Sequence, residues 1–89
     1  MPEKNVTVCN ELGLHARAAA AFVRLSTTFE CEIFVACRDA EVDGKSIMGV
    51  MMLAAAKGSD LTIRAEGADA APAVKRLAEL VSDRFGEER

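Results

Sequence analysis

His15 is the residue of this chain whose side chain is best suited to reactive chemistry, and it is the only histidine. It follows Gly13 and Leu14, where a loop is expected to meet the start of a helix. The unpaired backbone N–H groups of a first helical turn carry partial positive charge and attract anions. The same field disfavours a protonated imidazole and leaves one ring nitrogen free to attack. The sequence therefore predicts a nucleophilic histidine beside an anion site.

Arg17 follows His15 by two residues and can lean over the same helix end. Its guanidinium would bind a second face of a phosphoryl group. A nucleophile, backbone donors and a guanidinium are the groups needed to accept a phosphoryl group on histidine. No Asp or second His lies nearby to complete a hydrolytic site, and Glu11 is separated from His15 by a glycine. One His and one Arg are by themselves a weak pattern, for which a surface histidine capping a helix is the simpler interpretation.

The elements that would position these residues follow from hydrophobic periodicity. Strands are predicted over 5–9, 31–37, 40–42 and 60–66, and helices over 16–27, 47–57 and 70–85. This β-α-β-β-α-β-α order predicts an α+β open-faced β-sandwich, in which three helices cover one face of a four-stranded antiparallel sheet. Ferredoxin-like folds share most of this order, so the topology alone names no function.

The helix ends and buried faces can also be predicted. Ser46 is suited to be the N-cap of the second helix, which Gly58 is expected to end. Asp69 can cap the last helix, with Pro72 in its first turn. The residues expected to face the core are Ala19, Phe22, Val23 and Ser26 in the first helix and Val74, Leu77, Ala78, Val81 and Phe85 in the last.

Length and composition narrow the class of protein. Eighty-nine residues, 51% of them hydrophobic, predict a single domain over 1–89. A net charge of −3 argues against a nucleic-acid-binding domain. The apolar runs are too short or too alanine-rich to span a bilayer, and the first residues do not resemble a signal peptide. We expect a cytoplasmic monomer without metal or cofactor, in which Cys9, Cys31 and Cys37 are small buried residues on strands.

Two segments carry a family resemblance. Residues 12–19 (LGLHARAA) resemble the active-site segment of HPr, the histidine-containing phosphocarrier of the bacterial phosphotransferase system. Residues 44–49 (GKSIMG) resemble the regulatory serine segment of that family. The likeness extends over roughly residues 5–85, with Ala18 standing where many members have proline.

The resemblance implies a phosphoryl carrier. His15 would be phosphorylated at Nδ1 by enzyme I, itself charged from phosphoenolpyruvate, and would pass the group to an enzyme IIA domain. The carrier would serve sugar uptake or a nitrogen-regulatory branch. Arg17 would neutralise the transferring group, and the backbone amides of Ala16 and Arg17 would bind it. Ala16 lacks a hydroxyl that some members have at this place, and backbone amides can still do the binding.

The same resemblance implies regulation and docking. Ser46 would be phosphorylated by a bifunctional HPr kinase/phosphorylase, if the host has one. Methionines usually pack in cores, but a short helix cannot bury every side, and exposed methionines make an adaptable docking surface. Phe22 is assigned to the core by its spacing. The residues expected to dock partners are Leu14, Arg24, Ile47, Met48 and Met51.

Two other functions compete with the carrier. One is a purely regulatory binding module that acts through phospho-Ser46, against which the presence of His15 argues. The other is a small hydrolase of acylphosphatase type, suggested by the similar strand order but lacking a matching phosphate-binding loop. Incubation with enzyme I and phosphoenolpyruvate would separate the three, because only the carrier acquires an acid-labile phosphoryl group.

Overall fold

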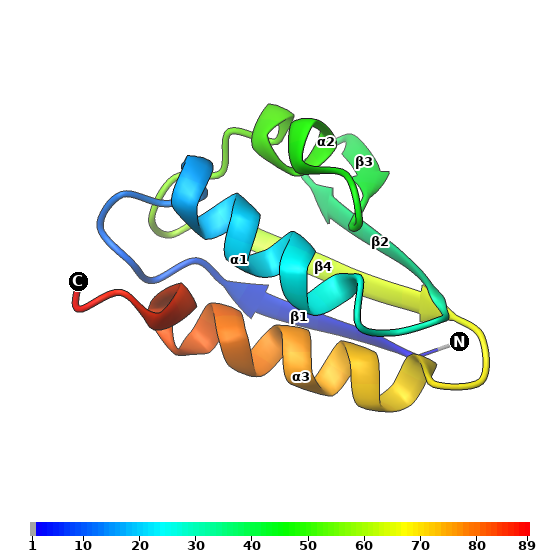
Figure 1. The fold of residues 1–89 in the computed structure, drawn as a ribbon. Coiled ribbons are helices and arrows are strands. Elements are labelled where there is room, and N and C mark those ends of the chain that lie inside the picture. Colours follow the sequence, from blue (N-terminus) through cyan, green and yellow to red (C-terminus); the bar gives the residue numbers. More distant parts are fainter. Residues whose placement is uncertain (1) are drawn as a thin grey trace.

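The computed structural model describes residues 2–89 and contains the predicted order of elements (Figure 1). The strands are β1 (Glu3–Thr7), β2 (Glu32–Cys37), β3 (Ala40–Asp43) and β4 (Asp60–Glu66). The helices are α1 (Ala16–Ser26), α2 (Ile47–Met52) and α3 (Ala70–Ser82), and a short 3-10 helix (Arg84–Gly86) follows.

The four strands form one antiparallel sheet in the order β1-β4-β2-β3. Alternate residues of β2 and β4 point to a buried face, as the alternation predicted: Ile33 and Val35 pair with Ala65 and Ile63 across the two central strands, and all four are buried. Figure 1 shows the three helices on one face of the sheet. The predicted fold class is therefore confirmed.

The helices contribute the faces that the periodicity indicated. Phe22, at 1% exposure, is the largest fully buried side chain and lies on α1, as predicted. The buried stripe of α3 also agrees with the prediction, except that Phe85 lies in the 3-10 helix rather than in α3. The apolar faces of α1 and α3 pack against the sheet. This packing fixes the position of α1 and therefore that of its first residues.

The predicted length of the second helix is wrong, because α2 ends at Met52 and not near Lys57. Ala54 adopts a left-handed backbone conformation (φ +50°), which stops the helix. The chain then turns Ala55 into the core, and its carbonyl accepts a hydrogen bond from the Leu14 N–H at 2.8 Å. Packing against the loop before α1 therefore outweighs the helical propensity of residues 53–57.

The role predicted for Asp69 is also wrong. Asp69 holds the N-cap position of α3, but its side chain makes no capping hydrogen bond. Its carboxylate instead accepts the backbone N–H groups of Glu30 and Cys31, both at 2.9 Å. The hydrogen bond from the Glu30 N–H is the main cause that lowers the pKa of Asp69 below its ordinary value. Asp69 therefore holds the entry to β2 instead of the start of its own helix.

The cysteines agree only in part with the prediction that all three are buried on strands. Cys37 is buried on β2, and Cys31 is buried directly before that strand, where burial raises the pKa of its thiol. Cys9 is exposed and lies beyond the end of β1, with its Sγ 3.5 Å from the Ser82 carbonyl oxygen.

None of the helices within residues 2–89 is both long and apolar enough to cross a membrane.

Candidate functional site

A tight loop between β1 and α1 carries the site. Gly13 has a left-handed backbone (φ +67°), and a Cβ there would lie 2.6 Å from the carbonyl oxygen of Ala55. Only glycine meets both conditions without strain. The fully buried Asn10 donates from Nδ2 to the Gly13 carbonyl at 2.8 Å. The loop is therefore fixed on one side by Asn10 and on the other by the segment after α2.

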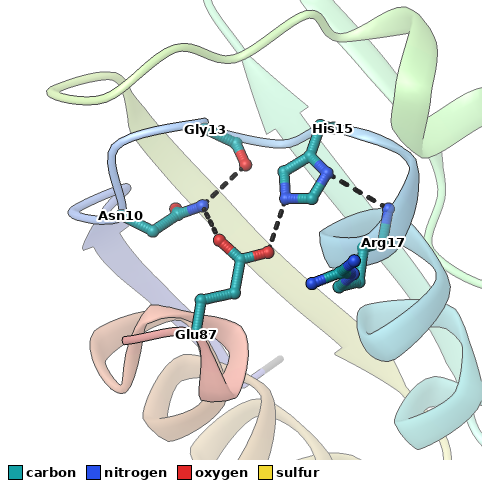
Figure 2. A network of polar contacts seen from close by, with 5 residues as sticks. All are labelled: Asn10, Gly13, His15, Arg17 and Glu87. Carbon is teal, nitrogen blue, oxygen red and sulfur yellow. Dashed lines mark hydrogen bonds and ion pairs between the residues drawn. The ribbon is translucent and has the colours of Figure 1, made fainter. Parts of the chain in front are cut away.

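His15 is the N-cap residue of α1. Its backbone is extended (φ −84°, ψ −177°), and its carbonyl accepts the Ala19 N–H at 2.8 Å. Its Nδ1 accepts the Arg17 N–H at 3.3 Å, as Figure 2 shows. Because a backbone N–H can only donate, Nδ1 is unprotonated in this arrangement and accepts through its lone pair. The predicted position of His15 at a helix start is confirmed.

Glu87 is the member of the site that sequence reasoning missed. Its Oε2 lies 2.5 Å from Nε2 of His15, although the two residues are 72 positions apart in the chain. Its Oε1 accepts from Nδ2 of Asn10 at 2.9 Å. Burial acts to raise the pKa of Glu87, but the hydrogen bonds from Asn10 and His15, with the charge of Arg17, outweigh it and lower that pKa. Glu87 is therefore ionised at neutral pH.

Arg17 and Ala16 supply the donors around Nδ1. Both residues are exposed, and Figure 2 shows the Arg17 side chain on the same side of the ring as the Glu87 carboxylate. The N–H of Ala16 has no hydrogen-bond acceptor among residues 2–89, as expected of the first turn of a helix. Glu11 is exposed and makes no hydrogen bond with His15 among the described contacts.

Ser46 is the N-cap of α2, as predicted, and its Oγ accepts the Gly49 N–H at 3.1 Å. The apolar side chains of α2 next to it are exposed: Ile47 at 46%, Met48 at 74% and Met51 at 41%. Leu14, in contrast, is only 5% exposed and packs in the core, so its assignment to a docking surface is corrected. Arg24 is exposed.

The neighbouring Leu12 is 72% exposed, and sequence reasoning did not include it. Its place in the loop directly before the Gly13-Leu14-His15 segment was the signal that could have found it.

The arrangement can bind and accept an anionic electrophile at Nδ1. Nε2 contacts a carboxylate, and Nδ1 is unprotonated and accepts the Arg17 N–H. The unpaired N–H of Ala16 belongs to the same helix start, and Figure 2 shows the Arg17 side chain beside the ring. Within the described part of the chain, no group of three or more His, Cys, Asp or Glu side chains is placed to hold a metal ion. An open-faced α+β domain with a single histidine at a helix start, whose Nδ1 is unprotonated, has the features of a small group-carrier domain.

Comparisons with known proteins specify that class. Residues 2–83 match the family model described as "PTS HPr component phosphorylation site". The chain is 49% identical over 89 residues to phosphocarrier protein HPr of Pseudomonas aeruginosa and 45% identical over 87 residues to that of Neisseria meningitidis. Each alignment covers 98% of both chains. A crystal structure of HPr from Thermoanaerobacter tengcongensis superposes with a TM-score of 0.95 at 40% identity, covering all of both chains.

The chain belongs to the HPr family of the phosphotransferase system. It is accordingly a phosphocarrier, a component that holds and passes on a phosphoryl group, and not a catalytic enzyme.

Proposed function

We propose that His15 accepts a phosphoryl group at Nδ1 from enzyme I and passes it to an enzyme IIA domain. The observation that carries this proposal is the lone pair of Nδ1, which faces the Arg17 N–H at the start of α1. A phosphoryl group bonded to Nδ1 would lie beside that N–H and the unpaired N–H of Ala16, where the helix dipole favours negative charge. The Arg17 guanidinium would neutralise a further part of its charge.

The exposed side chains of Ile47, Met48 and Met51 form the docking surface of this proposal. The hydrogen bond from Leu14 to Ala55 fixes the segment after α2 against the loop that carries His15. A partner that covers these apolar side chains would therefore be brought close to Nδ1. Arg24 adds positive charge for an acidic partner. In this proposal residues 1–89 act as one domain, as a monomer in transient complexes in the cytoplasm.

The test is incubation with enzyme I and phosphoenolpyruvate. A single phosphoryl adduct that is lost in acid and stable in base supports phosphohistidine, because phosphoserine has the opposite stability. Transfer of the label from the isolated adduct to an enzyme IIA domain supports the second half of the cycle. Absence of any adduct with an enzyme I that charges another HPr protein would refute the proposal.

We expect Arg17→Ala to slow phosphoryl transfer in both directions with little change in melting temperature, because the side chain is exposed. Arg17→Lys is expected to recover only part of the rate, since lysine keeps the charge but loses the planar fork. Stopped-flow or quench-flow transfer rates measure both. Wild-type rates in the two variants would exclude the role of the guanidinium.

We further propose that Ser46 is a regulatory phosphorylation site for an HPr kinase/phosphorylase. A phosphate on Oγ would accept N–H groups of the first turn of α2, one of which, from Gly49, already donates to that oxygen, so the fold is expected to persist. The same phosphate would place two negative charges beside Ile47 and Met48. An apolar partner surface would then have to desolvate a phosphate, and an acidic one would meet like charge.

Ser46→Asp is therefore expected to raise the Michaelis constant of enzyme I for this protein several-fold while leaving kcat nearly unchanged. Added salt is expected to reduce the effect, because exposed charges are screened. Steady-state measurements at two ionic strengths test this, with Ser46→Ala as the control that loses the cap but adds no charge. If the Asp variant matches the Ala variant at low salt, Ser46 is only a helix cap.

A further inference from the structure

The chain after α3 folds back onto the site. Arg84, Phe85 and Gly86 all have positive φ angles (57°, 54° and 81°), which turn the chain sharply after α3. Two non-glycine residues in this region are strained by about 1–2 kcal/mol each. Burial of the Phe85 side chain, which is 6% exposed, offsets this cost. The turn thus has an anchor in the core, and it directs Glu87 toward the loop that carries His15.

Both oxygens of the Glu87 carboxylate have a partner there. Oε1 accepts from Asn10, whose other Nδ2 hydrogen goes to the Gly13 carbonyl, and Oε2 contacts Nε2 of His15 (Figure 2). The side chain of Glu87 is only 13% exposed, against 28% for His15. A carboxylate held on both oxygens and largely covered has a fixed position, so it can fix the position of its partner.

The two ring contacts of His15 specify one state of the imidazole. An ionised carboxylate only accepts, so Nε2 must carry the proton, and the Arg17 N–H only donates, so Nδ1 must carry the lone pair. Rotation of the ring by half a turn about its bond to Cβ would place carbon atoms at both positions and lose both hydrogen bonds. Glu87 therefore selects the tautomer and the ring orientation that direct a lone pair to the start of α1.

We propose that Glu87 is a positioning residue for His15, which holds Nδ1 toward α1 and balances the charge that the ring gains on phosphorylation. The inference rests on the proposed transfer at Nδ1. In that step the Nδ1 lone pair forms the N–P bond, while the bond from phosphorus to the donor atom breaks and its electron pair stays with the donor. Because Nε2 keeps its proton, the ring becomes positively charged, and the Glu87 carboxylate faces that N–H. Passing the group on reverses these changes.

Glu87→Ala is expected to lower kcat for phosphoryl acceptance about tenfold, since losing the outer hydrogen-bond partner of a functional histidine costs about 10–100-fold in metal sites. The Michaelis constant for enzyme I is expected to stay within about twofold, because α2 is untouched. Glu88→Ala is the matched control. It removes the same charge one residue later, from an exposed side chain without a contact to His15 among the described hydrogen bonds, and it is expected to match the wild type.

A second readout needs no phosphorylation. The chain has a single histidine, so its ring nitrogens give one set of ¹⁵N signals. In the wild type and in Glu88→Ala, two well-separated shifts are expected, one from a protonated nitrogen and one from an unprotonated nitrogen. In Glu87→Ala the two shifts are expected to approach each other as tautomers and ring orientations mix.

The inference requires both effects in Glu87→Ala and neither in Glu88→Ala. Unchanged ring signals or an unchanged kcat in Glu87→Ala would overturn it, as would equal losses in the two variants. If the wild type itself accepts no phosphoryl group, the proposed function fails, whereas the ring signals still report whether Glu87 holds the imidazole.

Discussion

Replacement of His15 by Ala is expected to abolish acid-labile phosphorylation by enzyme I completely. No second histidine exists to take over, and the remaining donors around the site hold no lone pair that can attack phosphorus. The fold is expected to survive, because the side chain is only partly covered and its capping hydrogen bond is long, at 3.3 Å. The loss of that cap costs about 1 kcal/mol. Radiolabel incorporation and a thermal unfolding curve measure the two effects.

His15→Asn separates the two roles of this residue. Asparagine is among the best N-cap residues, so the helix start is retained while the nucleophile is lost. We expect stability close to that of the wild type and the same absence of label. Stoichiometric acid-labile labelling in either variant would contradict the assignment of the phosphorylated residue.

Among substitutions near the site that add one methyl group, Gly13→Ala is expected to lower the melting temperature most. The left-handed backbone alone costs about 1–2 kcal/mol for alanine. The new Cβ would also lie 2.6 Å from the Ala55 carbonyl oxygen and 2.9 Å from the Ala56 Cα, both backbone atoms that cannot rotate away. At about 4–8 °C per kcal/mol for a domain of this size, the melting temperature is expected to fall by roughly 10 °C or more.

The phosphoryl acceptance of Gly13→Ala is expected to fall as well, because the displaced loop carries His15 and the carbonyl that Asn10 binds. Gly58→Ala is the matched control. Gly58 also has a positive φ (+92°), but its Cβ would meet no heavy atom within 4 Å. Calorimetry on both variants therefore compares the backbone cost with and without the steric contact. Equal melting temperatures would show that the contact with residues 55 and 56 has no energetic weight.

Much of the fold could be predicted because local and tertiary preferences agree in most elements. The alternation in β2 and β4 and the apolar face of α1 each have one interpretation, and the structure has them where they were predicted. The end of α2 could not be predicted in this way. Residues 53–57 have helical propensity, but the buried Ala55 and its hydrogen bond to Leu14 depend on a loop about forty residues earlier.

The same distinction between local and tertiary preferences applies to the residues of the site. The position of His15 as an N-cap and that of Ser46 follow from local sequence and were predicted. Glu87 could not be found, because its contact with His15 depends on the turn at Arg84–Gly86 and on the anchoring of Phe85 in the core. Leu14 was misplaced for a similar reason: it lies beside His15 in the loop, but its N–H donates to the Ala55 carbonyl and its side chain is buried in the core.

The two outer strands of the sheet have a consequence for solubility. β1 and β3 each pair on one side only, so their free edges offer unpaired backbone groups to any other extended chain. Both edges are short and charged, with Glu3 and Lys4 on β1 and Glu41 and Asp43 on β3. A strand from another molecule that paired with either edge would place its own side chains next to these charged residues. The open sheet is thereby protected from strand-by-strand growth into aggregates, even though its helices cover only one of its faces.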